Sequence, residues 1–169
     1  MRLILILLVL FCTSNCGFKP LHYVVNGENM LSSIEYVGTL DKEKNPTATF
    51  FLNKEVDKIL STYDDRTKIK YILSISYDVD IDDYLIQSNS YANRKKVTVK
   101  MMYKISDIYT KDVVVSGTLM DFESFAITES PYSDYVVEED LITATLLSLV
   151  QELRVQLIAK MADKIIVKD

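Results

Sequence analysis

The segment IKYILSISYDVDI, residues 69–81, decides the fold. Its odd-numbered residues are all apolar, and its even-numbered residues are polar with the exception of Ile72. A period of two residues is typical of a β-strand that buries one face and exposes the other. The segment therefore predicts a one-sided sheet that must be covered by other elements.

The alternation changes at the end of this segment. After Asp82 and Asp83, the apolar residues are Tyr84 and Ile86, which are even-numbered. An extra residue in one strand of an antiparallel pair would shift the alternation in this way. We therefore expect a β-bulge at Asp82-Asp83, before a turn at residues 88–90.

Two further strands are predicted after the turn. The first covers residues 91–105, where one face is apolar and the other is mostly basic. The second covers residues 113–120 and contains Gly117, which indicates a bulge or a close backbone approach. The apolar residues predicted to face the core from the first of these strands are Val97, Val99, Met101, Tyr103 and Ile105.

Two amphipathic helices are predicted, each with an N-cap residue followed by proline at the first helical position. One begins at Asn45-Pro46 and ends near Asp64, and the other begins at Ser130-Pro131 and ends near Ile165. Apolar residues follow one face of each helix. These residues are Leu52, Val56, Ile59 and Tyr63 in the first, and Ile142, Leu146, Leu149, Leu153 and Leu157 in the second.

A strand at residues 32–40 precedes the first helix, so the predicted order is strand, helix, three strands, helix. One-sided strands and amphipathic helices bury each other when both helices cover the same face of the sheet. We therefore predict an α+β fold with a four-stranded, mostly antiparallel sheet and two helices on one face. The other sheet face is expected to be polar and exposed.

The N-terminus has the layout of a secretory signal. Arg2 precedes the apolar run Leu3–Phe11, and small polar residues follow before Cys16. The run is too short for a transmembrane helix, which needs ~20 apolar residues. We expect a signal peptide at residues 1–15 and a lipidated cysteine at Cys16. A plain secretory signal followed by a free thiol is the alternative.

The expected organisation is therefore a lipidated tether at residues 16–31 and a single domain at residues 32–169. Acyl chains on Cys16 would hold this domain at a membrane surface. Because Cys12 would leave with the signal peptide, no disulfide is expected. Stability must then come from packing.

Few residues could support catalysis. His22, in the tether, is the only histidine, and four glycines form no phosphate-binding loop. The cluster Asp78, Asp80, Asp82 and Asp83 lacks the glycine and distal glutamate of a calcium loop. We therefore expect no enzyme, no cofactor and no metal. With 24 Asp and Glu against 19 Lys and Arg, nucleic-acid binding is not expected either.

The candidate site is a basic row on the strand at 91–105. Residues on its polar face include Arg94, Lys96, Lys100 and Lys104. In an acidic protein, such a row could pair with phosphates. The alternative is a solvated face balanced by Asp78 and Asp80 on the neighbouring strand.

Several motifs together resemble the alphaproteobacterial form of the lipopolysaccharide-assembly lipoprotein LptE. They span nearly all of the chain after the signal. The motifs are Cys16-Gly17-Phe18-Lys19-Pro20-Leu21, Tyr84-Leu85-Ile86-Gln87-Ser88, Val115-Ser116-Gly117-Thr118, and Ser130-Pro131-Tyr132-Ser133 followed by Glu138-Glu139-Asp140.

The resemblance implies an outer-membrane lipoprotein on the periplasmic side. It would plug and help assemble the LptD β-barrel and assist delivery of lipopolysaccharide to the outer leaflet. Arg94, Lys96, Lys100 and Lys104 would then contact the phosphates of lipid A. Two other hypotheses are a periplasmic adaptor lipoprotein of a lipid-transport ABC system and, less favoured, an anchored hydrolase.

Overall fold

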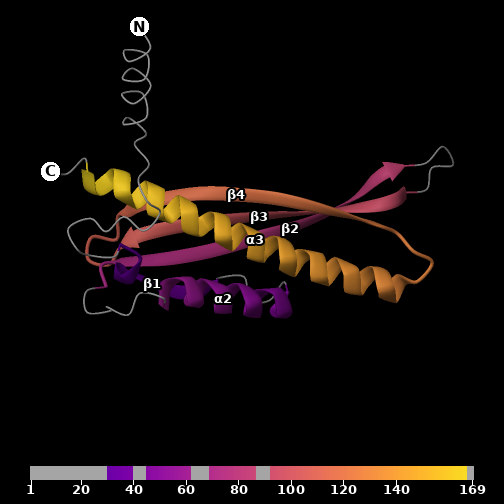
Figure 1. The fold of residues 1–169 in the computed structure, drawn as a ribbon, viewed down its shortest axis with the longest axis horizontal. Helices are drawn as coiled ribbons and strands as arrows, with labels where there is room; N and C mark the ends of the chain where they lie inside the picture. The colour runs from indigo at the N-terminus through magenta and orange to yellow at the C-terminus, as the bar shows by residue number, and fades with distance from the viewer. Residues whose placement is uncertain (1–29, 40–44, 62–68, 87–91, 167–169) are drawn as a thin grey trace, which may run out of the picture.

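The computed structural model describes residues 30–39, 45–61, 69–86 and 92–166 (Figure 1). Cys16, His22, the predicted signal and residues 16–29 of the predicted tether lie outside these residues, as does Tyr63. Residues 30 and 31, which the sequence assigned to the tether, belong to η1, and Leu31 is buried in the core. The elements, in order, are a 3-10 turn η1 (Met30–Ser33), β1 (Ile34–Thr39), α2 (Pro46–Ser61), β2 (Tyr71–Ile86), β3 (Ala92–Asp107), β4 (Val113–Ala126) and α3 (Pro131–Ile166).

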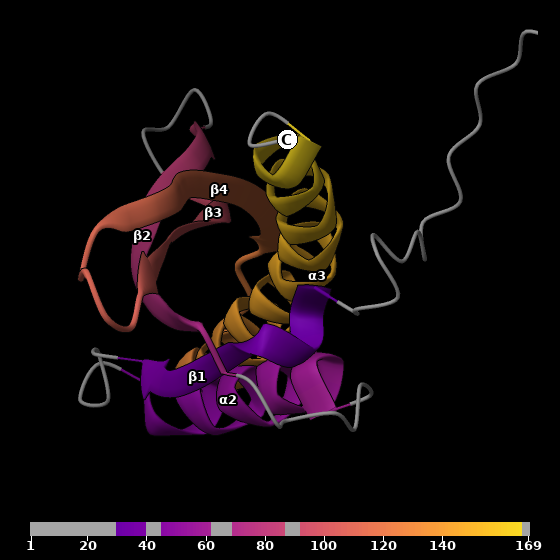
Figure 2. The same cartoon turned by 90° about the vertical axis from the view of Figure 1, so that its left-hand side faces the viewer.

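The strands form one sheet in the order β1-β2-β3-β4. β1 pairs with β2 in parallel, because α2 returns the chain to the same end of the sheet, and the other two pairs are antiparallel. Figure 2 shows the sheet curving around its inner face, with α2 below β1 and α3 beside β4. The predicted α+β architecture and element order are confirmed.

The predicted apolar faces meet in one core. The alternation of residues 73–77 and 97–105 places their odd-numbered side chains on the inner face, and the α3 stripe packs against them. The buried residues from these elements are Leu73, Ile75, Tyr77, Val97, Val99, Met101, Tyr103, Ile105, Ile142, Leu146, Leu149, Leu153 and Leu157. α2 adds Leu52, Val56 and Ile59 from its own predicted face.

α3 combines a long apolar sequence with a buried stripe. A window between Pro131 and Met161 has a mean hydropathy of 1.4, which by composition alone would allow a membrane span. Of this window 39% is buried, and the buried residues, which include Leu146, Leu153 and Leu157, account for that part of its apolar character by packing in the core.

The bulge predicted at Asp82-Asp83 is wrong. The register between β2 and β3 is unbroken from Tyr71↔Asp107 to Tyr84↔Arg94. Tyr84 therefore lies on the outer face, 46% exposed, and Ile81 on the inner face is 37% exposed. The alternation fails there because the sheet extends past the well-packed core, where burial no longer selects apolar residues for one face.

A register shift occurs instead between β3 and β4. Ile105 pairs with Val115 and Ser106 pairs with Val113, so Val114 is the extra residue. β4 then continues to Ala126, beyond the predicted end at Met120. The sequence pattern hides this extension because Asp121 and Glu123 occupy inner-face positions.

Gly117 permits a close approach, but of a side chain and not of the backbone that was predicted. A Cβ atom at this position would lie 2.5 Å from the Tyr103 hydroxyl oxygen and 2.7 Å from Cε1 of the same ring. The Tyr103 hydroxyl forms hydrogen bonds with two residues of α3: it donates to Gln156 Oε1 at 2.9 Å and accepts from Lys160 Nζ at 2.7 Å. Gly117 is thus required for the side chain that joins β3 to α3.

Asn45 caps α2 and also connects three elements. Its Oδ1 accepts from the Ala48 amide at 3.0 Å, which confirms the predicted N-cap, and its Nδ2 donates to Glu139 Oε2 on α3 at 2.9 Å. Its backbone carbonyl accepts from the Tyr77 hydroxyl at 3.3 Å. Burial of this polar residue is therefore compensated by hydrogen bonds.

Candidate functional site: the outer face of the sheet

The four predicted basic residues lie on one face of β3. They are even-numbered, whereas the inner, buried residues of the strand are odd-numbered. Since successive side chains of a strand point to opposite faces, the four project together from the outer face of the sheet. Lys95 has the opposite parity, and its Nζ lies 3.8 Å from Glu138 Oε2 on α3.

Two of the four are engaged with β4. Arg94 Nη2 donates to the backbone oxygen of Ser124 at 2.9 Å and to its Oγ at 3.0 Å. Lys96 Nζ lies 4.6 Å from the centroid of the Phe122 ring, a cation–π geometry. Both side chains therefore help to hold the outer face together, and a ligand would compete with these contacts.

The other two are the more exposed cations. Lys100 and Lys104 are both exposed. Lys100 pairs in register with Asp78 on β2 and Met120 on β4, whereas Lys104 pairs with Ser74 and Ser116. Lys104 thus has uncharged cross-strand neighbours, as does Arg94, and of these two Lys104 is the more exposed.

The acidic residues form a separate row on β2. Asp78, Asp80 and Asp82 face the same side as the basic row and pair with Lys100, Thr98 and Lys96. Opposite charges at directly paired positions stabilise a sheet modestly. The alternative of a balanced, solvated face therefore applies best to Lys96 and Lys100, and least to Lys104.

An apolar row on the other side of the lysines was not predicted. Met120 is 65% exposed and Phe122 is 58% exposed on β4, and Met102 on β3 is 40% exposed. Met102 pairs with Thr118, so Met120 is its diagonal neighbour across the strands. The alternation of residues 118–124 could have revealed this row, had the strand been extended past Met120.

The outer face therefore carries an acidic row on β2, a basic row on β3, and an apolar row formed by Met120 and Phe122 of β4 together with Met102 of β3. A surface that places cations beside exposed apolar side chains can bind a ligand that carries both anionic and apolar groups. We call the basic and apolar rows together the amphipathic face: Arg94, Lys96, Lys100, Lys104, Met102, Met120 and Phe122.

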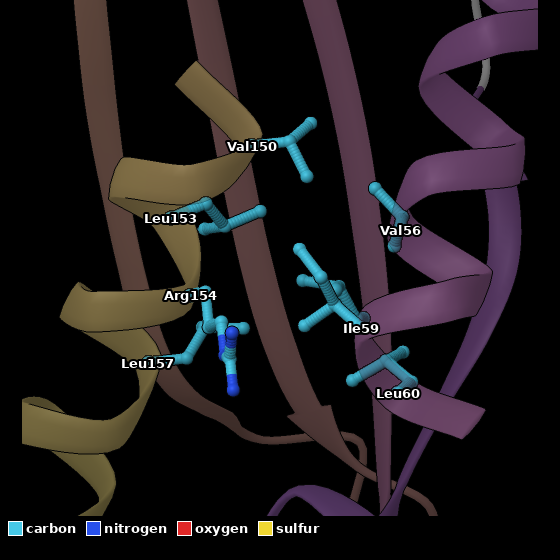
Figure 3. A pocket seen from close by; sticks show the side chains of 8 residues that line it. Val56, Ile59, Leu60, Val150, Leu153, Arg154 and Leu157 are labelled. Atoms are coloured by element: carbon cyan, nitrogen blue, oxygen red, sulfur yellow. The ribbon is translucent and has the colours of Figure 1, made fainter. Parts of the chain in front are cut away.

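The pocket between the two helices is not a comparable site. Figure 3 shows apolar side chains of α2 and α3 converging there, with Arg154 beside them. Its volume is only about 10 Å³, which is room for no more than one water molecule. It is a packing gap, and a lipid-sized ligand must bind elsewhere.

Comparison with solved structures identifies the fold. A lipoprotein B of Nitrosomonas europaea matches with a TM-score of 0.58 and 10% identity, over 83% of this chain and 92% of that one. A minor lipoprotein of Acinetobacter baumannii matches with a TM-score of 0.56 and 12% identity, over 77% and 93%. A candidate lipoprotein of Caulobacter crescentus matches with a TM-score of 0.55 and 17% identity, over 79% of this chain and 93% of that one.

No family model matches the sequence, and no curated protein matches it. The chain therefore has a fold found in bacterial lipoproteins, and at these identities the likeness concerns the fold alone.

Proposed function

We propose that this protein is an outer-membrane lipoprotein, acylated at Cys16, that plugs and helps assemble an LptD-type β-barrel. In this role it binds lipopolysaccharide during its transfer to the outer leaflet. The observation that carries the proposal is the amphipathic face, which offers cations and apolar side chains side by side on a fold found in bacterial lipoproteins.

The chemistry of the ligand fits this face. Lipid A presents phosphates next to acyl chains, so Lys100 and Lys104 pair with phosphates while Met102 and Met120 contact the adjoining apolar groups. Hydrogen bonds to charged groups are stronger than neutral ones. The acidic row on β2 repels phosphates, and this repulsion orients the ligand toward β4.

The fold also suits a barrel lumen. Outer-membrane barrels of sufficient size enclose a polar, water-filled interior. A domain whose core is internal and whose outer sheet face is charged can be lodged there without exposing its core. No reaction is required of the protein in this role.

The partner is tested by isolating the lipoprotein from membranes of its source cell in mild detergent, with a tag after Asp169. Stoichiometric recovery of a large outer-membrane barrel supports the plug. Recovery of inner-membrane permease subunits would instead support the ABC adaptor, and recovery of the lipoprotein alone would contradict both.

The ligand is tested by charge reversal on the amphipathic face. We expect the Lys100→Glu/Lys104→Glu variant to bind purified lipopolysaccharide at least about tenfold more weakly at low salt, since loss of a single hydrogen bond to a charged group costs about 1.5–3 kcal/mol and each 1.4 kcal/mol is about tenfold in affinity. Adding Arg94→Glu and Lys96→Glu should weaken binding further, although Arg94→Glu also removes the bonds to Ser124.

The matched control reverses two charges elsewhere. Lys54 and Lys58 are exposed on α2, so Lys54→Glu/Lys58→Glu makes the same change in net charge without touching the sheet. Equal binding by the quadruple variant and the wild-type protein at low salt would refute the site. A loss of equal size in the α2 control would show that net charge alone is responsible.

A further inference from the structure

β4 is the last strand in the sheet order, so one of its edges has no strand beside it. In an antiparallel pair, alternate residues direct their N–H and C=O groups toward the partner strand, and the others direct them away. The Phe122 amide donates to Asp121 Oδ1 at 2.8 Å, which shows that its N–H points away from β3. Because the register is unbroken from Arg94↔Ala126 to Ile105↔Val115, the even-numbered residues of β4 face the open edge.

Side chains cap both ends of this edge. Lys160 Nζ lies 3.5 Å from the Ser116 carbonyl oxygen at one end. At the other end Arg94 donates to the Ser124 carbonyl oxygen, and the Asp121 carboxylate accepts a hydrogen bond from the Phe122 amide. Charged side chains commonly protect exposed strand edges against unwanted pairing.

The centre of the edge is left open. Thr118 and Met120 are both exposed, and no side chain among the described residues bonds their outward N–H and C=O groups. Backbone groups in this arrangement are complementary to another extended chain, which can pair with all of them at strand spacing. A helix or a lipid cannot do so.

The side chains around the open segment specify the partner further. On the outer face, Met120 and Phe122 are exposed apolar groups. Asp121 and Glu123 occupy inner-face positions next to the open segment, and Glu123 is exposed. A strand placed beside β4 would therefore be favoured by apolar residues on its outer face and basic residues on its inner face.

We propose that the open segment of β4, which contains Thr118 and Met120, docks an extended segment of a partner protein, in which apolar and basic residues alternate, by strand addition. The capped ends restrict the pairing to a short stretch, so the edge selects a segment and does not promote open-ended association. The proposal stands whether or not the amphipathic face binds lipopolysaccharide.

The probe is a short, end-blocked peptide of alternating valine and lysine, added to the full-length protein in detergent. We expect the Thr118 and Met120 amides to exchange about tenfold more slowly with the peptide bound, because hydrogen-bonded amides exchange only through opening. The matched control peptide has the same side chains but N-methyl groups on alternate amides, and it should give no protection.

A pair of protein variants tests the same edge. Thr118→Pro removes an outward N–H at an edge position, where proline is tolerated, and should abolish peptide binding. Thr118→Val keeps the N–H and should bind like the wild-type protein. Circular dichroism shows whether the proline variant retains its fold, and the N-methylated peptide provides a test that needs no variant.

Three results would overturn the proposal. They are equal binding of the N-methylated peptide, equal binding by a folded Thr118→Pro variant, and absence of protection at Thr118 and Met120 with saturating peptide. Protection of these amides in a concentration-dependent dimer without peptide would show that the occupant is a second copy of this chain.

Discussion

Gly117 is the residue whose identity is set most directly by a neighbour, because the Tyr103 ring occupies the place of a side chain. We expect Gly117→Ala to destabilise the protein by about 1–3 kcal/mol, the usual cost of overpacking a core. Urea unfolding measures the change. In a Tyr103→Ala background, which removes the ring, the same substitution should cost far less, and an equal cost in both backgrounds would contradict this explanation.

Tyr36 should give the protein an alkaline sensitivity. Burial, with a smaller effect from the charge of Asp57, raises the pKa of Tyr36 well above its usual value. Its hydroxyl also donates to Asn53 Oδ1 at 2.5 Å. Because the folded state keeps this group protonated while the unfolded chain ionises near pH ~10, stability is full below that pH and falls as pH rises above it.

The measurement is the free energy of unfolding as a function of pH for wild-type protein and Tyr36→Phe. We expect the variant to lose less stability above pH ~10, since phenylalanine cannot ionise. Its lower stability at neutral pH, caused by loss of the bond to Asn53, does not affect the comparison of slopes. Parallel curves would show that Tyr36 does not cause the alkaline loss.

The N-cap residues of the two helices differ in their burial and in their hydrogen bonds to other elements. Asn45 is buried and bonded to α3, whereas Ser130 is exposed and lies 3.4 Å from the Ser133 amide it caps. An N-cap replaced by alanine typically costs about 1 kcal/mol. We expect Asn45→Ala to cost about 2–3 kcal/mol, because it also leaves the buried end of α2 without a partner on α3.

Ser130→Ala is the matched control, since it removes the side chain that precedes the other helix-starting proline. Thermal and urea unfolding of both variants give the comparison. A cost at Ser130 as large as that at Asn45 would mean that capping alone, without the contact to Glu139, accounts for the effect.

The hairpin of β2 and β3 should be unevenly stable along its length. Near Ile75 and Met101 it is fully buried, whereas Ile81 and Tyr84 are substantially exposed at its far end. Local opening requires less free energy where few apolar contacts must be broken. Amides of residues 82–84 and 94–96 should therefore exchange faster than those of residues 73–77 and 99–105.

Hydrogen exchange of the full-length protein, followed by mass spectrometry or NMR, measures this gradient. Uniform protection along the hairpin would show that the far end is held by contacts other than the core. Loss of the gradient when an LptD-type barrel is bound would place the far end of the hairpin in the interface.

Most elements and their buried faces follow from the local pattern of apolar and polar residues. Apolar residues that recur every two or every 3.6 positions show which face of a strand or helix is buried. The buried faces of Val97 to Ile105 and of Ile142 to Leu157 were therefore predicted correctly. The N-cap at Asn45 and the common face of the four basic residues follow from equally local rules. The same parity argument breaks down where the core ends, which is why the bulge at Asp82-Asp83 was wrong.

The neighbours of each row, in contrast, are visible only in the folded protein. The parallel pairing of β1, the apolar row of β4 beside the lysines, and the contacts of Arg94 with Ser124 all depend on strand order and register. The open centre of the β4 edge, between ends capped by Arg94 and Lys160, depends on them too. Strand order and register arise from contacts between segments far apart in the chain. The periodicity of apolar residues in the sequence indicates only whether a residue is buried.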